Sequence, residues 1–209
     1  MSRVLVISPH PDDEAIGCGG TLCRHVARGD EVQAVFLTSG EKGGHGHSPA
    51  DTRRRREREA EKAARFLGIH YLEFWREPDG ALHASQRVVE RLRRKLREWQ
   101  PDVVYAVHDR EMHPDHRASV RALRRAMGGL RRRKPEVWLF EVWTPIQQLD
   151  EIVDISPYLA TKLRAVRAYR SQCAVVGFAA AVRGLNRYRG ELHSWPGGDY
   201  AEVFRRLRV

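Results

Sequence analysis

Two short clusters of histidine and acidic residues stand out in the sequence, because their side chains are of the types that bind metal ions. The first, HPDDE at residues 10–14, places one imidazole and three carboxylates within five positions. The second, HPDH at residues 113–116, contributes two imidazoles and one carboxylate. Carboxylates held this close repel one another, and a divalent cation with imidazole and carboxylate ligands offsets that repulsion. The two clusters therefore predict a metal site.

The same residue types indicate hydrolysis as the chemistry. A hydrolytic zinc site has three protein ligands and one open position for water, so not all of these side chains can be ligands. One remaining carboxylate can face the water as a general base, and one imidazole can face the oxyanion that develops during attack. Residue types and spacing alone leave open which side chain takes which role.

The pattern of apolar residues shows which elements must hold these clusters. Short apolar or β-branched runs predict strands at residues 4–7, 32–37, 69–75, 103–107 and 137–142. Helical spacing predicts helices at residues 15–28, 52–67, 86–99 and 114–127. Strands that alternate with helices are typical of βαβ units. The predicted fold class is α/β, a single doubly wound, mostly parallel sheet with helices on both faces (Rossmann-like).

Both clusters lie between a predicted strand and the helix that follows it. In a parallel α/β sheet this places them at the carboxyl edge, where ligands bind, so the clusters are expected to meet. Taken separately, Asp12 or Asp13 could cap the helix that begins near Ala15, and the two histidines of HPDH could be solvated. The occurrence of both clusters at strand ends favours the metal site over these alternatives.

A glycine-rich stretch, GCGG at residues 17–20, follows the first cluster. A dinucleotide-binding loop must open directly after the strand, so that its backbone can approach the pyrophosphate. Here the HPDDE cluster occupies that place, and the glycines fall about one turn into the predicted helix. We therefore expect the glycines to permit close packing of this helix on the sheet, and not to bind a nucleotide.

Length and composition indicate a soluble globular protein. The chain has 209 residues, of which 42% are hydrophobic and 31% are charged, and it has no apolar run long enough to span a bilayer. We predict a single domain over residues 1–209, less regular from about residue 143, with helices at residues 157–171 and 199–206. The start of the chain lacks the features of a signal peptide, and its three cysteines are too few for a disulfide framework. A cytoplasmic location is expected.

The net charge of +10 raises the question of a nucleic-acid partner. The basic excess is mostly arginine, in runs such as residues 53–58 and 91–98 that have helical spacing. Such runs are typical of solvated helix faces, and no aromatic residues for base stacking lie between these arginines. We expect no nucleic-acid partner. A basic nucleic-acid-binding protein with a structural metal is kept as a distant alternative.

With these motifs established, the sequence resembles the PIG-L/LmbE-like family of zinc-dependent N-deacetylases. The hallmarks of the family are PHPDDE followed by GCGGTL, present here at residues 9–14 and 17–22, and a later HPDH. Weaker matches run along the chain as TSGE (38–41), RxxEA (56–60), LG (67–68), PDG (78–80), DIS (154–156) and YRSQ (169–172). The resemblance implies the activity of a GlcNAc-type deacetylase.

The resemblance also implies a role for the main residues of the two clusters. His10, Asp13 and His116 would bind the metal, Zn²⁺ or another divalent cation such as Fe²⁺. Asp12 would act as the general base toward the attacking water. His113 would stabilise the oxyanion and protonate the leaving amine.

Three residues receive supporting roles from the resemblance. Asp115 would orient a ligand imidazole from behind, while Arg56 and Asp79 match positions that contact the substrate sugar in relatives. One position departs from some relatives, which act on thiol-linked glucosamine inositols and have a tyrosine two residues before HPDH, where this chain has Glu111. An ionised carboxylate cannot donate a hydrogen bond, so we expect no oxyanion role for Glu111.

The implied reaction is hydrolysis of a linear amide C–N bond. It removes the N-acetyl group from an N-acetylglucosamine-type substrate, an amino sugar or glycoconjugate, and releases acetate. The alternative within the same chemistry is a metal-dependent amidase that acts on a thiol conjugate or an antibiotic precursor. The expected partner is a small N-acetylated sugar. Relatives often assemble into trimers or hexamers, so a homo-oligomer is compatible with the resemblance.

Overall fold

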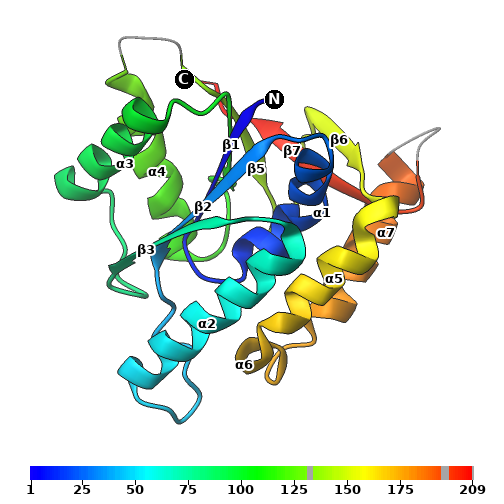
Figure 1. The fold of residues 1–209 in the computed structure, drawn as a ribbon, viewed down its shortest axis with the longest axis horizontal. Coiled ribbons are helices and arrows are strands. Elements are labelled where there is room, and N and C mark those ends of the chain that lie inside the picture. Colours follow the sequence, from blue (N-terminus) through cyan, green and yellow to red (C-terminus); the bar gives the residue numbers. More distant parts are fainter. Residues whose placement is uncertain (131–133, 194–197, 209) are drawn as a thin grey trace.

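The computed structural model describes residues 1–130, 134–193 and 198–208. Within these residues the chain forms one seven-stranded sheet that is flanked by helices (Figure 1). The strands, in chain order, are β1 (Arg3–Ser8), β2 (Glu31–Thr38), β3 (Tyr71–Glu77), β4 (Val103–Val107), β5 (Glu136–Phe140), β6 (Glu151–Asp154) and β7 (Ala201–Arg206). In space they follow the order β3-β2-β1-β4-β5-β7-β6.

The strands β1 to β5 run parallel, and β7 runs antiparallel to both β5 and β6. Because β1 has β2 on one side and β4 on the other, the winding of the chain reverses between β1 and β4. Val4, Leu5 and Ile7 of β1 are fully buried, as expected for a parallel strand covered on both faces. The predicted fold class, a doubly wound and mostly parallel α/β sheet, is confirmed.

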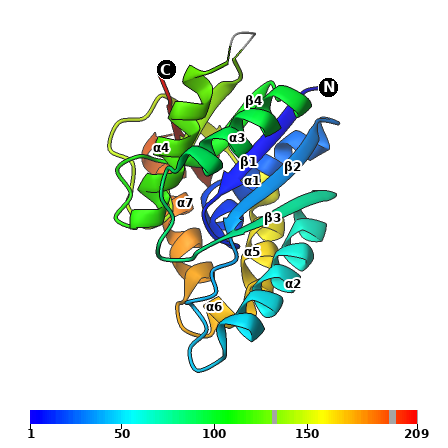
Figure 2. The same ribbon diagram turned by 90° about the vertical axis from the view of Figure 1, so that its left-hand side faces the viewer.

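The helices pack in two layers. In chain order they are α1 (Asp13–Ala27), α2 (Pro49–Leu67), α3 (Gln86–Trp99), α4 (Pro114–Gly128), the 3₁₀ turn η1 (Ser156–Tyr158), α5 (Leu159–Ala168), α6 (Arg170–Cys173) and α7 (Phe178–His193). The pair α3 and α4 covers one face of the sheet, whereas α1, α2 and α5 pack together on the other (Figures 1 and 2). α7 contacts α5 and β7.

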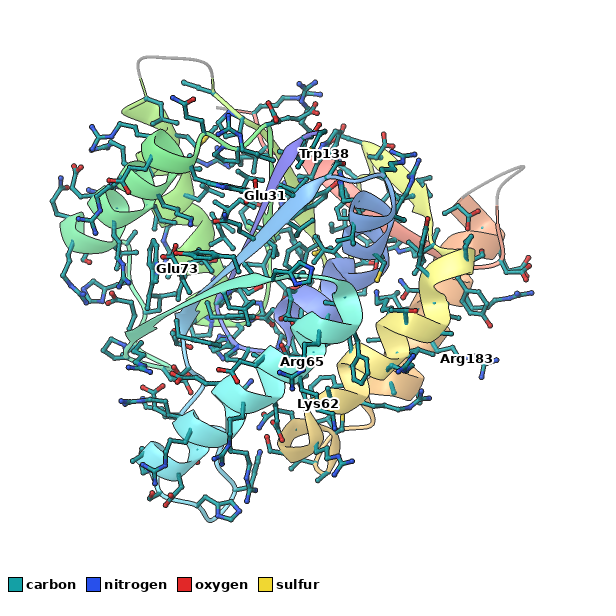
Figure 3. All side chains as sticks on the ribbon, viewed as in Figure 1. Glu31, Lys62, Arg65, Glu73, Trp138 and Arg183 are labelled. Carbon is teal, nitrogen blue, oxygen red and sulfur yellow. The ribbon has the colours of Figure 1, made fainter. Side chains whose placement is uncertain are left out.

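Charged side chains cover the outer faces of the helices. Lys62 and Arg65 on α2 and Arg183 on α7 are exposed (Figure 3). The arginine run at residues 53–58 is partly exposed in the same way, but Arg56 within it is buried. None of the helices in the described part of the chain combines the length and the apolar character needed to cross a membrane.

The C-terminal part differs from the sequence-based prediction. The predicted helix at residues 157–171 is divided into η1, α5 and α6. The predicted helix at residues 199–206 is wrong, because residues 201–206 form strand β7. Tertiary pairing overrides local propensity here. β7 satisfies the open edge of β5 and buries Val203 and Phe204 in the process.

The buried carboxylate of Glu202 connects β7 both to α5 and to α1, the helix that follows the first cluster. Glu202 on β7 and Lys162 on α5 are 2.6 Å apart, and both are buried. Glu202 also accepts the backbone N–H groups of Gly20 and Thr21, each at 2.8 Å. These amides are available because α1 departs from helical geometry at Cys18. The C-terminal strand therefore helps to hold α1 in place.

The glycines of α1 allow this helix to lie unusually close to its neighbours. A Cβ atom at Gly17 would lie 2.0 Å from the Phe140 ring, and one at Gly20 would lie 2.7 Å from Cβ of Ile155. Both distances are well inside the optimal separation of about 3.5–4.0 Å between carbon atoms. The prediction that these glycines serve close packing is confirmed.

We expect Gly20→Ala to lower the free energy of unfolding by about 1–3 kcal/mol, because the added methyl group must displace Ile155 from a packed core. Gly184→Ala is the matched control, since Gly184 also lies inside a helix, α7, but has nothing within 4 Å of its Cβ position. Alanine is the better helix former, so the control should be neutral or stabilising by up to about 1 kcal/mol. Denaturant unfolding measures both variants, and equal effects would contradict the packing argument.

Candidate active site

The two clusters meet at the carboxyl edge of the sheet. β1 and β4 are paired neighbours, and they flank the point where the winding reverses, which is where open α/β sheets bind ligands. His10 follows β1, while His113 and His116 lie at the start of α4, after β4. The ring centroid of His10 is 4.8 Å from that of His113 and 5.2 Å from that of His116. Residues 106 positions apart, His10 and His116, thus share one site.

The donor atoms of His10, Asp13 and His116 have the spacing of ligands around one metal ion. His10 Nδ1 and His116 Nε2 lie 3.3 Å apart. Each of these nitrogens is also 3.3 Å from a carboxylate oxygen of Asp13, Oδ2 for His10 and Oδ1 for His116. Tetrahedral ligands at zinc distances lie roughly 3.3–3.6 Å from one another. The residues present therefore fit a divalent cation.

His113 completes the group of imidazoles. The ligand atoms of His10, His113 and His116 all lie within 4.8 Å of one another. His113 caps α4, and its Nδ1 accepts the backbone N–H of Asp115 at 3.2 Å. Burial, together with the neighbouring imidazoles, lowers the pKa of His113. A neutral imidazole whose Nδ1 accepts a hydrogen bond carries its proton on Nε2, so His113 can donate from Nε2.

Two carboxylates contact the opposite nitrogen of His10. Its Nε2 lies 3.3 Å from Asp115 Oδ2 and 3.2 Å from Asp79 Oδ1. These three residues form a second group of donors within 4.8 Å of one another, on the side of His10 that faces away from His116. Carboxylates in such a place orient an imidazole and make it a stronger ligand. Asp115 is itself held by the backbone N–H groups of Gly80 and Leu82.

The two predicted substrate contacts, Arg56 and Asp79, line the same cavity as the clusters, yet both are buried and bonded to the protein. Arg56 donates from Nη2 to Asp12 Oδ2 at 3.0 Å and to the Pro11 carbonyl at 2.6 Å. Burial raises the pKa of Asp79, but its hydrogen bond with His10 lowers it, to about 2. Both side chains therefore support the clusters directly, and this support had no signal in the sequence.

Asp12 occupies a strained backbone position beside the donor atoms. Its φ of 132° lies in a region that residues other than glycine rarely adopt. The backbone N–H of Asp12 donates to Glu14 Oε2 at 3.2 Å, and the other Glu14 oxygen accepts a hydrogen bond from the Tyr169 hydroxyl. Burial raises the pKa of Asp12 to about 7, although the Arg56 guanidinium lowers it. Glu14 and Arg56 thus hold the backbone and the carboxylate of Asp12.

Glu14 and Tyr169 are parts of the site that had no predicted role. Glu14 is 2% exposed and Tyr169 is 1% exposed, and the two residues are separated by 155 positions. Tyr169 belongs to YRSQ, one of the weaker family matches. That motif marks the residue as notable, but it contains no information about the side chain that Tyr169 contacts.

Glu111 is a further buried carboxylate next to the site. It is 1% exposed, and one oxygen lies 3.7 Å from His116 Nδ1. Its Oε1 accepts the backbone N–H groups of Val142 and Trp143 at 2.7 and 3.0 Å. Burial raises the pKa of Glu111, but the neighbouring His108 and His116 side chains and the hydrogen bond from the Val142 amide lower it well below its usual range. Glu111 therefore serves as an acceptor that links two loops.

The clusters line a cavity of 390 Å³, a volume within the range of small-molecule sites. The cavity is polar where the loop with Lys42 and His45 borders it, and apolar where Trp143, Val176 and Phe178 border it. His45 is exposed, as is His47, which also lies in this glycine-rich loop. The arrangement can hold a metal ion, a general base and a hydrogen-bond donor around one small substrate.

Comparisons with known proteins agree with this geometry. A family model described as PIG-L, GlcNAc-PI de-N-acetylase, matches residues 5–127, a range that contains both clusters. A probable N-acetyl-alpha-D-glucosaminyl L-malate deacetylase 2 of Bacillus anthracis is 28% identical over 201 residues, which cover 88% of this chain and 85% of the relative. The structure of N,N'-diacetylchitobiose deacetylase from Pyrococcus horikoshii has a TM-score of 0.86 at 29% identity, and covers 99% of this chain and 84% of the other.

A protein with a different activity shares the fold. GalB, the 4-carboxy-2-hydroxymuconate hydratase from Pseudomonas putida KT2440, has a TM-score of 0.88 at 23% identity, and the match covers 100% of this chain and 97% of the other. At this identity the likeness shows the fold alone. The family match rests instead on more than half of the chain, including HPDDE and HPDH. The chain belongs to the PIG-L family.

Proposed function

We propose that the protein is a metal-dependent N-deacetylase that hydrolyses the acetamide of an N-acetylglucosamine-type substrate and releases acetate. The observation that carries this proposal is the set of donor atoms of His10, Asp13 and His116, spaced 3.3 Å apart, with the Asp12 carboxylate beside them. The names of the matched family and of the two deacetylases describe the same class of reaction, which supports the proposal.

The proposed metal ligands are His10, Asp13 and His116. Two imidazoles and one carboxylate are a donor set that zinc prefers in hydrolytic sites, so we propose Zn²⁺, with Fe²⁺ as another cation that suits this set. When bound, the cation polarises the amide carbonyl and makes an attacking water more acidic. Asp115 and Asp79 hold the His10 ring with Nδ1 toward the other ligands.

Asp12 is the proposed general base. Its Oδ2 accepts the hydrogen bond from Arg56, which keeps the carboxylate in place beside the cavity. The attacking water passes its proton to this carboxylate. Arg56 and Asp79 also line the cavity, and we propose that both contact hydroxyl groups of the substrate sugar there.

His113 is the proposed stabiliser of the oxyanion. Because its Nδ1 accepts a hydrogen bond from the Asp115 amide, its Nε2–H can donate to the carbonyl oxygen as negative charge develops. The amide nitrogen must gain a proton before the amine leaves. We assign this step to Asp12, which carries the proton taken from the water. A neutral His113 that gave up its Nε2 proton would be left as an unstable imidazolate.

A thiol conjugate or an antibiotic precursor is the alternative substrate, and it would use the same catalytic residues.

We further propose a cytoplasmic location for the protein. Cys18, Cys23 and Cys173 are free cysteines, which agrees with a reducing compartment. The partner we propose is a small N-acetylated sugar, and not a nucleic acid.

An acetate-release screen tests the proposal. Metal-free protein, reloaded with Zn²⁺ or Fe²⁺, is incubated with N-acetylated sugars, sugar-inositols, sugar-malates and N-acetylated thiol conjugates. We expect acetate from at least one sugar substrate, and only after reloading. No acetate from any substrate, with metal bound to the protein, would contradict the proposal. Hydration of an unsaturated dicarboxylic acid without acetate release would assign the chain to other chemistry that this fold supports.

We expect Tyr169→Phe to lower kcat by roughly tenfold, because a buried hydrogen bond to Glu14, whose pKa burial raises to about 8, is lost. The change removes only the hydroxyl that holds Glu14, so Glu14 no longer fixes the Asp12 backbone. In the Asp12→Asn background the same change should have little further effect on kcat. Metal content and KM should stay near their wild-type values.

Tyr105→Phe is the matched control for this prediction. The Tyr105 hydroxyl lies 3.0 Å from His25 Nε2, and Tyr105 does not line the cavity. Its loss should leave kcat unchanged. Equal kcat values for Tyr169→Phe and Tyr105→Phe would show that the Tyr169–Glu14 contact does not position Asp12.

A further inference from the structure

Trp143 is an exposed aromatic residue beside the candidate active site. It lies in the loop after β5, at the same edge of the sheet as the clusters, and lines the cavity together with His10 and Asp12. Trp143 is 44% exposed, whereas most of the surface of a large aromatic residue is usually buried. An exposed aromatic ring in the wall of a cavity that holds catalytic groups is typical of a ligand contact.

A buried carboxylate fixes the main chain around Trp143. Glu111 accepts the backbone N–H groups of Val142 at 2.7 Å, Trp143 at 3.0 Å and Thr144 at 3.3 Å. The backbone N–H of Met112 in turn donates to Thr144 Oγ1 at 3.0 Å. These bonds tie the loop to the segment that leads into α4 and its histidines. The loop therefore has a defined position relative to the proposed metal ligands.

The ring of Trp143 is supported as well. It meets the Phe178 ring edge to face, with centroids 5.5 Å apart and planes inclined by 68°. Aromatic pairs favour this arrangement, and Phe178 is only 8% exposed, so its own position is set by the core. The exposed part of the Trp143 ring is consequently presented to the cavity in one orientation.

The walls of the cavity are of two chemical kinds. Val175 (54% exposed) and Val176 (37% exposed) extend the apolar wall that Trp143 begins. Lys42 and His45, in the loop between β2 and α2, supply polar groups. A pyranose ring has a matching division, because C–H bonds line its faces and hydroxyl groups surround its rim. The Trp143 ring can pack against the C–H faces of the sugar, because both surfaces are apolar.

We propose that Trp143 is a substrate-binding residue, whose ring packs against the C–H face of the sugar that carries the acetamido group, and that Glu111 is its positioning residue. The inference rests on the proposed function, since it takes an N-acetylated sugar as the substrate. It adds that recognition depends on an apolar ring face, in addition to polar contacts with hydroxyl groups.

Binding of N,N'-diacetylchitobiose to the metal-loaded Asp12→Asn variant tests this inference, because the substrate should remain intact there. In that background we expect Trp143→Ala to raise Kd roughly tenfold or more, and Trp143→Phe to recover most of the affinity. Tyr188→Ala is the matched control. Tyr188 is an aromatic residue 52% exposed on α7 that does not line the cavity, so Kd should not change.

The role of Glu111 is tested in the same assay, with metal content measured on each variant. Glu111→Gln should weaken binding less than Trp143→Ala, and the combined variant should bind no more weakly than Trp143→Ala alone. An unchanged Kd in Trp143→Ala, or no binding of the disaccharide by the parent variant, would overturn the inference. Acetate release by the wild-type protein tests the proposed function separately. A failure of the inference about Trp143 can therefore be distinguished from a failure of the proposed function.

Discussion

Asp12→Asn is expected to lower kcat for acetate release by about 10²–10⁴-fold, the usual contribution of a general base. Asparagine has nearly the shape of aspartate, and its oxygen can still accept the hydrogen bond from Arg56, which spans 3.0 Å. It cannot take a proton from water. Metal binding should persist, because the proposed ligands are His10, Asp13 and His116. Steady-state kinetics and metal analysis on the same preparation separate the two effects.

Asp30→Asn is the matched control for this result. Asp30 contacts His25 Nδ1 at 2.8 Å and the Ser2 amide at 2.7 Å, and it directly precedes β2, at the amino edge of the sheet. Its kcat should equal that of the wild-type protein. Asp12→Ala, which also loses the bond with Arg56, should be at least as slow as Asp12→Asn. Near-wild-type turnover by both Asp12 variants across all accepted substrates would exclude Asp12 as the base.

His116→Ala is expected to abolish metal binding, and activity with it. His116 is fully buried, and its Nε2 lies 3.3 Å from both His10 Nδ1 and Asp13 Oδ1. The change removes one of three proposed ligands, so affinity should fall by more than the roughly 10–100-fold that loss of a supporting residue causes. Metal analysis after dialysis should find about one divalent ion per chain in the wild-type protein, and almost none in the variant.

Thermal unfolding provides a second test of whether His116 is a metal ligand. A cation that binds only the folded protein raises its Tm, so a chelator should lower the Tm of the wild-type protein and leave that of His116→Ala unchanged. His70→Ala is the control, because His70 is exposed between α2 and β3. It should respond to the chelator as the wild-type protein does. One metal ion per His116→Ala chain, held with wild-type affinity, would refute the ligand assignment.

Much of the fold could be predicted because its signal is local. The elements from β1 to α4 have apolar residues that repeat at strand or helix spacing. This periodicity can be recognised without knowing which elements pack against one another. β7 has no such signal. Glu202 is of a residue type that favours helices over strands. Its carboxylate can be buried in this strand only because Lys162 and the amides of Gly20 and Thr21 donate to it. That compensation comes from elements about 40 and 180 residues away.

The location of the candidate site was likewise accessible from sequence. HPDDE and HPDH each follow a predicted strand, and a parallel sheet brings such strand ends to one edge. The individual roles came from the family resemblance, since residue types alone left them open. The direction in which each side chain faces was not accessible. His10 turns Nδ1 toward His116 and Nε2 toward Asp79 and Asp115. This orientation depends on how the segments that follow β1, β3 and β4 are placed relative to one another.

The sequence by itself thus determined the kind of site and the edge of the sheet on which it lies. Only the tertiary structure decided how the base is held, through Tyr169, Glu14 and the strained backbone of Asp12, and how Glu111 presents Trp143 to the cavity. Tyr169 and Glu14 are 155 positions apart, and Glu111 and Trp143 are 32 apart. The physical reason is that such contacts form when separate elements pack into one core, and periodicity records which face an element buries, not which side chain it meets there.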